Sequence, residues 1–283
     1  MVNQFYFIMK ISFIYSIAFT LICSFLSVYS QEIPIEFLSM ELQTNQKEQH
    51  KTILNKEIDG VISEHVTISS DITEKVELEN GYKFVYLFIK GYGQLTSGGK
   101  TYEIVPETIM LPNNVGDVSF KPIANDTLHY LKISVFQTEL DQEDIKTFPK
   151  ENINNIYFKK FTDCKSYTEP IKSPQTTSRT ILPNKYIPRV AMGTVKTIGP
   201  DKVGAHEHAM LEQLFLGLTD NQTIVYADDA QVDFPEYSLL HIPRGSSHSV
   251  SVNAENEMYY VWMDFFVDKD GEEWLKTHNT EDE

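Results

Sequence analysis

Short runs of β-branched and aromatic residues, separated by turn-forming residues, recur along the chain from Val61 onward. The runs are rich in Val, Ile, Tyr, Phe and Thr, and Gly, Pro, Asn and Asp interrupt them. Strands of this length at regular spacing are typical of an antiparallel sandwich or barrel. The pattern therefore predicts an all-β fold, and its clearest strands are HVTIS at 65–69, KFVYLFI at 83–89, LHYLKISVF at 128–136, LEQLFLGL at 211–218 and MYYVWMDFF at 258–266.

The strands fall into two blocks that resemble each other. When Leu111-Pro112 is placed over Ile242-Pro243, both strands are followed by a glycine-containing turn and an alternating strand, at an offset of 131 residues. Repetition at this scale indicates a duplicated domain. We expect a leader at 31–60, a first domain at 61–138, a linker with one helical turn at 139–152, a second domain at 153–267, and a tail with a short helix at 268–283.

The stretch from Gly204 to Glu212 carries the strongest functional signal. Side chains alternate across a strand, so His206, His208 and Glu212 are expected to share one face with Met210. Two imidazoles and a carboxylate on an apolar inward face are costly to bury unless a partner satisfies them. A divalent metal accepts imidazole nitrogens and carboxylate oxygens together, which predicts a metal site here.

A fourth ligand is expected from His248, which follows a turn set by Pro243 and Gly245. The two stretches resemble the two motifs of the cupin superfamily: His-x-His, three or four residues and Glu, then Pro-x-Gly-x-x-His. The resemblance covers 190–265 through its motifs and 61–136 only through the strand pattern, and it implies two jelly-roll cupin barrels. It also implies that His206, His208, Glu212 and His248 hold one divalent ion, with iron, manganese, zinc and nickel not distinguished.

The first block lacks these ligands. At the 131-residue offset Asp117 falls where His248 lies, and no His-x-His precedes it between 74 and 86. His65 and His129 lie outside the motif positions. We therefore expect a first barrel without metal, an arrangement similar to that of ureidoglycine aminohydrolases. Their ligand order differs from that of this chain, so their activity is not transferred.

Other residues of the second block have both a functional and a structural interpretation. Arg244 is expected at the barrel mouth, as a clamp for a substrate carboxylate or as an ordinary surface arginine. Tyr226 and Tyr260, with Trp262, are candidates for a substrate wall, although core packing explains them equally well. Glu207, Leu211 and Phe215 are expected on the outward face, with the two apolar residues packing against the other barrel or against a second subunit in a homodimer.

Residues 1–30 have the features of a secretory signal peptide. The run at 11–30 is almost entirely apolar or hydroxylic and follows Lys10, which predicts cleavage near Ser30 and a secreted or periplasmic protein. A membrane anchor is the alternative, but no cluster of Lys or Arg follows the run. Cleavage removes one lysine and moves the net charge from −16 to −17, which argues against nucleic acid and anionic lipid as partners. Cys164 then remains as the single cysteine, so no intramolecular disulfide is expected.

Three functions are compatible with the sequence. The first is a non-haem metal enzyme, an oxygenase or a non-redox lyase, isomerase or hydrolase, that acts on a small organic acid or sugar-derived substrate. The second is a non-catalytic, metal-dependent protein that binds a sugar or an organic acid. The third is a structural barrel that the metal stabilises. Fold does not decide among them.

Overall fold

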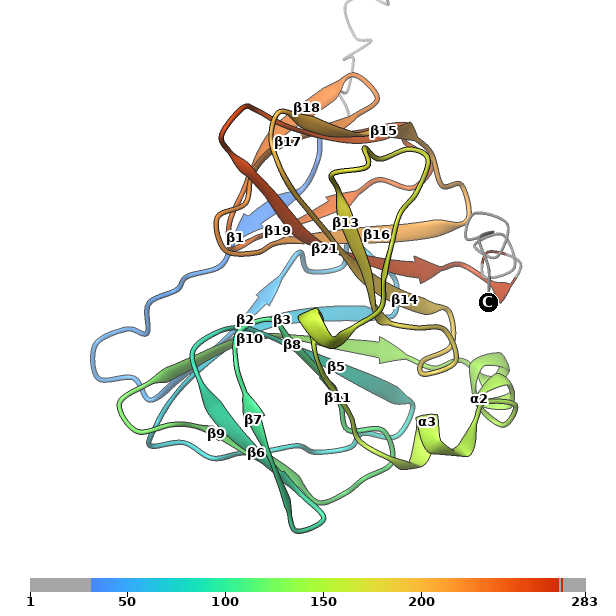
Figure 1. The fold of residues 1–283 in the computed structure, drawn as a ribbon. Helices are drawn as coiled ribbons and strands as arrows, with labels where there is room; N and C mark the ends of the chain where they lie inside the picture. The colour runs from blue at the N-terminus through green and yellow to red at the C-terminus, as the bar shows by residue number, and fades with distance from the viewer. Residues whose placement is uncertain (1–31, 270, 272–283) are drawn as a thin grey trace, which may run out of the picture. The chain divides into compact units, whose positions relative to one another are not determined.

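The computed structural model describes residues 32–269 and residue 271 of the 283-residue chain. Its strands form four sheets, two in each half of the chain (Figure 1), which confirms the all-β prediction. The predicted signal peptide at 1–30 and the helix expected around residues 272–276 lie outside the described residues. No helix within the described part of the chain is long and apolar enough to cross a bilayer.

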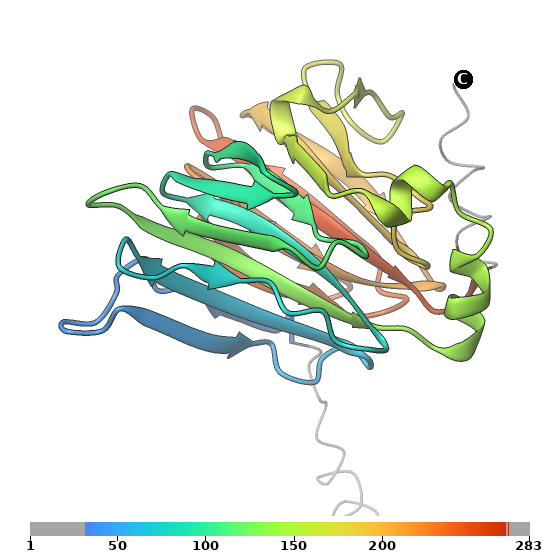
Figure 2. The same ribbon diagram turned by 90° about the horizontal axis from the view of Figure 1, so that it is seen from below.

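The first half forms a barrel from a six-stranded and a four-stranded sheet. The sheets have the orders β11-β8-β5-β10-β3-β2 and β4-β9-β6-β7, and Figure 2 shows strands of the larger sheet side by side. Residues of both sheets, such as Tyr130 and Phe120, share one core. The strands are β2 (Glu48–Ile53), β3 (Val61–Ser69), β4 (Glu74–Lys75), β5 (Tyr82–Lys90), β6 (Gly93–Ser97), β7 (Lys100–Ile104), β8 (Thr108–Leu111), β9 (Val118–Pro122), β10 (Thr127–Phe136) and β11 (Tyr157–Lys160).

The second half repeats this plan with a seven-stranded and a four-stranded sheet. The orders are β1-β19-β16-β21-β14-β13-β12 and β15-β20-β17-β18, and residues of both sheets, such as Phe215 and Val250, share a second core. The strands are β1 (Ile35–Phe37), β12 (Ser166–Tyr167), β13 (Thr177–Leu182), β14 (Val190–Ile198), β15 (Asp201–His206), β16 (Leu211–Gly217), β17 (Gln222–Ala227), β18 (Ala230–Pro235), β19 (Ser238–Ile242), β20 (His248–Val252) and β21 (Glu257–Phe266).

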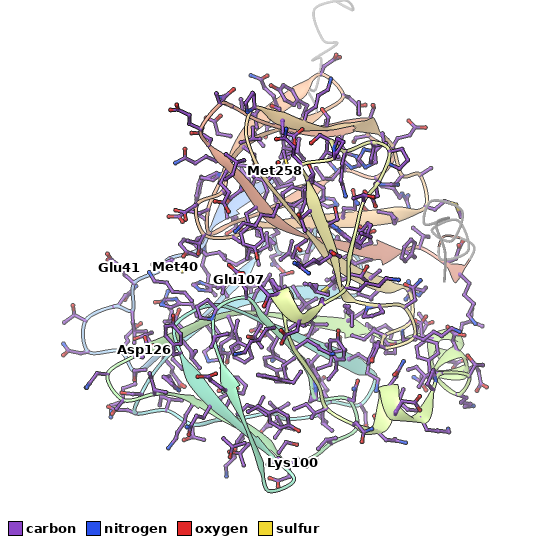
Figure 3. All side chains as sticks on the ribbon, viewed as in Figure 1. Met40, Glu41, Lys100, Glu107, Asp126 and Met258 are labelled. Carbon is purple, nitrogen blue, oxygen red and sulfur yellow. The ribbon has the colours of Figure 1, made fainter. Side chains whose placement is uncertain are left out.

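The two large sheets pack against each other through their outer faces. Leu87 and Leu131 of the first barrel lie in one buried cluster with Leu216 and Val261 of the second. The hydroxyl of Tyr259 also donates to Glu107 Oε2 at 2.5 Å, and Figure 3 labels Glu107. The barrels therefore share a core in addition to their own.

Each large sheet contains a strand from beyond the predicted domain boundary. β1, from the expected leader, pairs with β19 of the second barrel. β11, from the expected second domain, pairs with β8 of the first barrel. The leader is therefore part of the fold.

The linker between the barrels contains two short helices, α2 (Glu139–Ile145) and α3 (Lys150–Asn154), rather than the single turn predicted. A 3-10 turn, η1 (Phe161–Asp163), follows β11. Thr138 and Asp141 form a capping box at the start of α2. Asp141 also accepts hydrogen bonds from Arg189 Nε at 2.7 Å and Nη2 at 2.8 Å, which fastens the linker to the segment before β14.

The strand orders of the two barrels correspond, but the 131-residue offset between them is wrong. The β6–β7 hairpin turns at Gly98-Gly99, and the β17–β18 hairpin turns at Asp228-Asp229. Ser97 comes directly before the first turn and Ala227 directly before the second. Ser97 pairs with Val118, and Ala227 pairs with His248. Val118 therefore stands in place of His248, while Asp117 is an exposed residue just before β9.

Candidate metal centre

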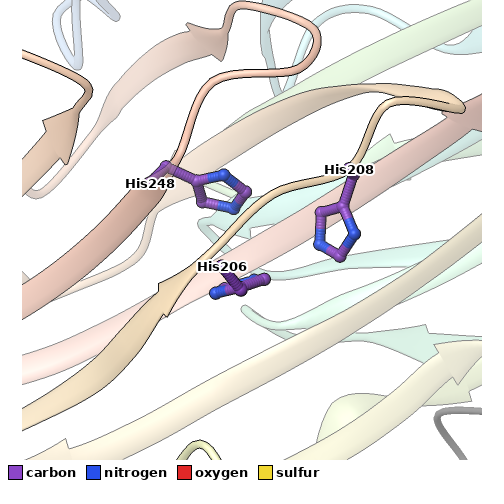
Figure 4. Close-up of side chains that lie close together, drawn as sticks. All are labelled: His206, His208 and His248. Atoms are coloured by element: carbon purple, nitrogen blue, oxygen red, sulfur yellow. The ribbon is translucent and has the colours of Figure 1, made fainter.

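Three histidines converge at one end of the small sheet of the second barrel. His206 is the last residue of β15 and His248 the first of β20, and the two are register partners. His208 follows two residues after β15. Each histidine offers one ring nitrogen, and these three nitrogens lie within 4.8 Å of one another (Figure 4). The structure therefore brings together the three histidines singled out in the sequence.

Backbone hydrogen bonds fix the ring state of two of these histidines. His206 Nδ1 lies 2.8 Å from the carbonyl of Gly204, and His248 Nδ1 lies 3.2 Å from the carbonyl of Ser246. A carbonyl only accepts, so each Nδ1 carries a proton, which leaves Nε2 as the nitrogen of each ring that can bind a metal. His248 Nε2 is buried and has no hydrogen-bond partner among the described residues. This arrangement of a carbonyl-bound Nδ1 and an available Nε2 is typical of metal-binding histidines.

Burial also keeps His248 in the form that binds metal. Removal from water, with a smaller contribution from neighbouring His206, lowers the pKa of His248 to about 4. The ring is therefore neutral at pH 7, and metal ligation requires a deprotonated nitrogen. The residues present thus fit a divalent ion.

The Pro-x-Gly-x-x-His segment positions His248 through a tight turn. Ser246 N donates to the carbonyl of Pro243 at 3.1 Å, and Gly245 has φ +78°, which a glycine adopts without strain. Gly245 N donates at 3.2 Å to the carbonyl of His208. The turn therefore also holds the segment that carries the second histidine.

The prediction that residues 206–212 form one strand is wrong. β15 ends at His206, a turn occupies residues 209–210, and β16 begins at Leu211 in the large sheet. Because the strand is interrupted, the alternation that starts at His206 does not continue to Glu212. β15 belongs to the small sheet of the second barrel and β16 to the large sheet.

Glu212 lies on the outer face of its strand, away from the histidines. Its Oε2 lies 3.1 Å from Nε2 of His241, and the other ring nitrogen of His241 lies 3.2 Å from Glu57 Oε2. Leu214, on the same face, belongs to the core between the two large sheets. The cluster of possible metal ligands among the described residues contains the three histidines without Glu212. Its carboxylate instead takes part in a polar contact that reaches the segment after β2.

Gln213 is the side chain that β16 turns into the barrel. It shares a face with Phe215, a residue of the second core whose ring centroid lies 6.1 Å from that of His248. Gln213 Nε2 donates to Asp264 Oδ1 at 2.8 Å, and its Oε1 is buried without a partner among the described residues. The sequence contained the signal for this residue, because the cupin motif allows four residues after the second histidine, and that spacing leads to Gln213.

Asp264 belongs to a polar cluster inside the second barrel that the sequence analysis missed. Burial raises the pKa of Asp264 to about 7, with a further contribution from Glu169. Lys172 is buried, forms an ion pair with Glu169, and donates to Ser178 Oγ at 3.0 Å. Asp264 shares the inward parity of Tyr260 on β21, and this alternation was the available signal.

The remaining candidates are distributed over the barrel surface and core. Arg244 is half exposed, and its Nε lies 3.8 Å from Glu212 Oε1. Tyr226 alternates with the buried Val225 and so faces away from the barrel interior, contrary to the prediction, whereas Tyr260 is a core residue. The two apolar residues expected on the outward face are buried instead. Phe215 lies in the second core. Leu211 lies in a separate buried cluster with Ala191 and Phe266. The residues that suggested a homodimer are therefore buried within the chain.

The sequence matches no protein-family model and no curated protein. Solved structures nevertheless share its fold. A cupin 2 conserved barrel domain protein from Leptotrichia buccalis aligns with a TM-score of 0.54 at 12% identity, over 84% of this chain and 99% of its own. A salicylate 1,2-dioxygenase from Pseudaminobacter salicylatoxidans gives 0.61 at 9%, over 89% of each chain. A Lactobacillus farciminis oxalate decarboxylase in complex with formate gives 0.57 at 10%, over 86% of this chain and 90% of its own.

The fold is that of a two-barrel cupin protein, as the motif resemblance implied. Its second barrel contains a histidine triad that can hold a metal ion. At identities near 10% the comparisons define the architecture, and the chemistry must be argued from the site.

Proposed function

We propose that the second barrel is a metal-dependent enzyme site that acts on a small organic acid. One divalent ion, of iron, manganese, zinc or nickel, would be held by Nε2 of His206, Nε2 of His248 and a ring nitrogen of His208. The observation that carries this proposal is the triad itself, with Nδ1 of His206 and His248 on backbone carbonyls and Nε2 of His248 left without a partner. A buried ring nitrogen without a partner is costly, and at His248 it lies beside two further histidine rings with which it could share a metal ion.

Gln213 is the proposed fourth ligand in place of Glu212. Its Nε2 is fixed by Asp264, so the amide oxygen is the group presented to the barrel interior. An amide oxygen is a neutral ligand, as are the three imidazoles. The site would therefore retain the full charge of the divalent ion, whereas a carboxylate ligand would have reduced it.

An uncompensated divalent charge favours an anionic substrate. The ion would supply Lewis acidity or a place for dioxygen. The chain's own residues would exclude water through the apolar core and hold a proton on Asp264 near pH 7. Salicylate dioxygenase and oxalate decarboxylase, which share the fold, are named for carboxylate substrates, and this supports an organic acid.

Export of the protein stays part of the proposal. It is supported by the apolar run at 11–30 behind Lys10, and the expected mature chain begins near Gln31. The N-terminal sequence of protein purified from its own host would test it, and an intact 1–30 segment would contradict it.

The metal site is tested by elemental analysis of purified protein and single-histidine variants. We expect one equivalent of metal per chain in the parent protein and a sharp loss in His206→Ala, His208→Ala and His248→Ala, because each removes one ligand. Thermal stability should fall in parallel, because ion binding to the folded state adds to its stability. His50→Ala, at an exposed position, is the matched control. Full metal content in all three variants would contradict the proposed site.

The enzymatic part is tested with the metal-loaded protein and a panel of small mono- and dicarboxylates. Oxygen uptake and product analysis would separate an oxygenase from non-redox chemistry. Binding of carboxylates without any turnover would instead support the alternative of a metal-dependent binding protein. An absence of both would leave the metal with a structural role only.

A further inference from the structure

We propose that the open mouth of the first barrel is a second, metal-free binding site, and that it takes a small organic ammonium ion with an apolar body. The site is distinct from the histidine triad and does not depend on the proposed function of the second barrel. It rests on three observations: the apolar replacement of the histidines, the cavity at this position, and the excess of carboxylates around it.

Aliphatic residues occupy the positions of the histidine triad in the first barrel. Val118 stands in place of His248, as the hairpin turns establish. Val76 N donates to the carbonyl of Val118 at 2.9 Å, so these two residues lie opposite each other on neighbouring chain segments. His206 and His248 lie opposite each other in the same way, and Val76 therefore corresponds to His206. Leu78, two residues further, then corresponds to His208. The three positions that hold the triad in one barrel are therefore aliphatic in the other.

This mouth remains open rather than filled by side chains. A cavity of about 630 Å³ is lined by residues that include Ile62 and Glu64 on β3, Tyr82 and Phe84 on β5, and Leu78. Glu64 and Phe84 continue the inward-facing rows of Val66 and Tyr86, so the cavity lies at the end of the barrel core. A volume of this size suits a small organic ligand.

Apolar surface is exposed around the opening. Ile62 is 42% and Leu78 43% exposed, and Phe136, whose ring centroid lies 5.5 Å from that of Tyr82, is 44% exposed. Three large apolar side chains at one opening, next to an aromatic floor, favour a ligand with an apolar body.

Negative charge dominates the same opening. Glu64, Glu77 and Glu79 line the cavity, and Lys132 is the one cation among the lining residues. Lys132 is already engaged, with its Nζ 3.4 Å from Glu64 Oε2 and 5.3 Å from the centroid of the Phe84 ring. No further cation lines the cavity beside Glu77 and Glu79. Charge complementarity therefore points to a cationic ligand.

An organic cation fits this opening better than a metal ion. The three carboxylates do not form a cluster that could hold a metal, because the histidine triad is the one such cluster of three or more residues among the described residues. Tyr82 offers an aromatic ring, and ammonium groups bind to the faces of such rings. Separated carboxylates and a tyrosine suit an ammonium group that is attached to an apolar body.

The test is isothermal titration of the full chain with four probes of similar size. Phenethylammonium and benzyltrimethylammonium should each bind at one saturable site, whereas neutral 2-phenylethanol and anionic 3-phenylpropionate should bind more weakly. The double variant Glu77→Gln/Glu79→Gln should weaken binding of the ammonium probes by about fivefold. Tyr82→Leu, which keeps an apolar side chain without the ring, should weaken it by about threefold.

Two controls locate the effect. Glu41→Gln/Glu255→Gln removes the same charge from exposed positions outside the cavity lining, and Figure 3 labels Glu41. It should leave ammonium binding unchanged, as should His248→Ala in the other barrel. Equal binding of 3-phenylpropionate or 2-phenylethanol would overturn the proposal, as would equal weakening by the control pair. A lack of saturable binding by both ammonium probes would overturn it as well.

Discussion

Glu212 and Gln213 are neighbours on β16 with opposite surroundings. Glu212 faces the core between the barrels, where its carboxylate lies beside His241. Gln213 faces the barrel interior, where Asp264 fixes its amide and leaves Oε1 unpartnered. One residue of register therefore separates a contact between barrels from a candidate metal ligand.

A pair of substitutions distinguishes these roles. Gln213→Met keeps the size but removes the amide oxygen, so metal affinity should fall by roughly tenfold or more. Glu212→Gln should keep full metal content but lower the free energy of unfolding by about 1–3 kcal/mol, because it weakens charge-assisted contacts. Metal titration and urea unfolding measure the two effects. Loss of metal in Glu212→Gln with retention in Gln213→Met would restore Glu212 as the ligand.

At the scale of elements, α2 shows how the linker is integrated into the fold. Asp141 of α2 is 3% exposed. It belongs to the capping box and also accepts the two hydrogen bonds from Arg189. Burial alone would raise the pKa of Asp141, but the hydrogen bonds from Arg189 and Thr138 hold it below its usual value. The carboxylate is therefore charged at pH 7 and fully paired.

Asp141→Asn should lower the free energy of unfolding by about 1–3 kcal/mol, because it replaces a charge-assisted pair and leaves Arg189 with a weaker acceptor. Urea unfolding at pH 7 measures the change. Glu143→Gln, on the same helix but in an exposed pair with Lys146, should change stability by less than about 0.5 kcal/mol. Equal effects of the two variants would show that α2 contributes little through its contact with Arg189.

At the scale of the whole molecule, two buried histidines lie on the outer face of the six-stranded sheet, the face that packs against the second barrel. His65 and His129 are each 3% exposed, their rings stack with centroids 5.6 Å apart, and His129 Nδ1 lies 3.1 Å from Thr67 Oγ1. Burial lowers the pKa of each ring to about 4; Lys51 adds to this effect at His65, and His65 and Lys90 add to it at His129. Both rings are therefore neutral in the folded protein at pH 7.

These histidines should make stability depend on pH. Their pKa in the unfolded chain is about 6.5, so between pH 6.5 and 4 the unfolded state binds more protons and stability falls as the pH falls. His65→Gln should reduce the loss of stability between pH 7.5 and 5 by about 1–2 kcal/mol. His50→Gln, at an exposed position, is the control. Urea unfolding at both pH values measures the slope, and identical slopes in His65→Gln and the parent would refute the assignment.

The sequence by itself determined the local features. β-branched and aromatic runs form strands wherever they occur, so the all-β fold and its duplication could be read directly. The spacing of His206, His208 and His248 was sufficient to predict that they converge, because a short turn fixes the position of the last histidine. These inferences depend on residues close in sequence or on a motif with a constant geometry.

Tertiary structure decided what alternation could not. Alternation holds only while a strand continues, and the interruption at 207–210 restarts it in another sheet, so Gln213 rather than Glu212 faces inward. No local preference in the sequence marks the residue at which β16 begins, because hydrogen bonds to β19 and β21 set its register. The same holds for β1 and β11, which join sheets distant in sequence because those sheets offer them an edge.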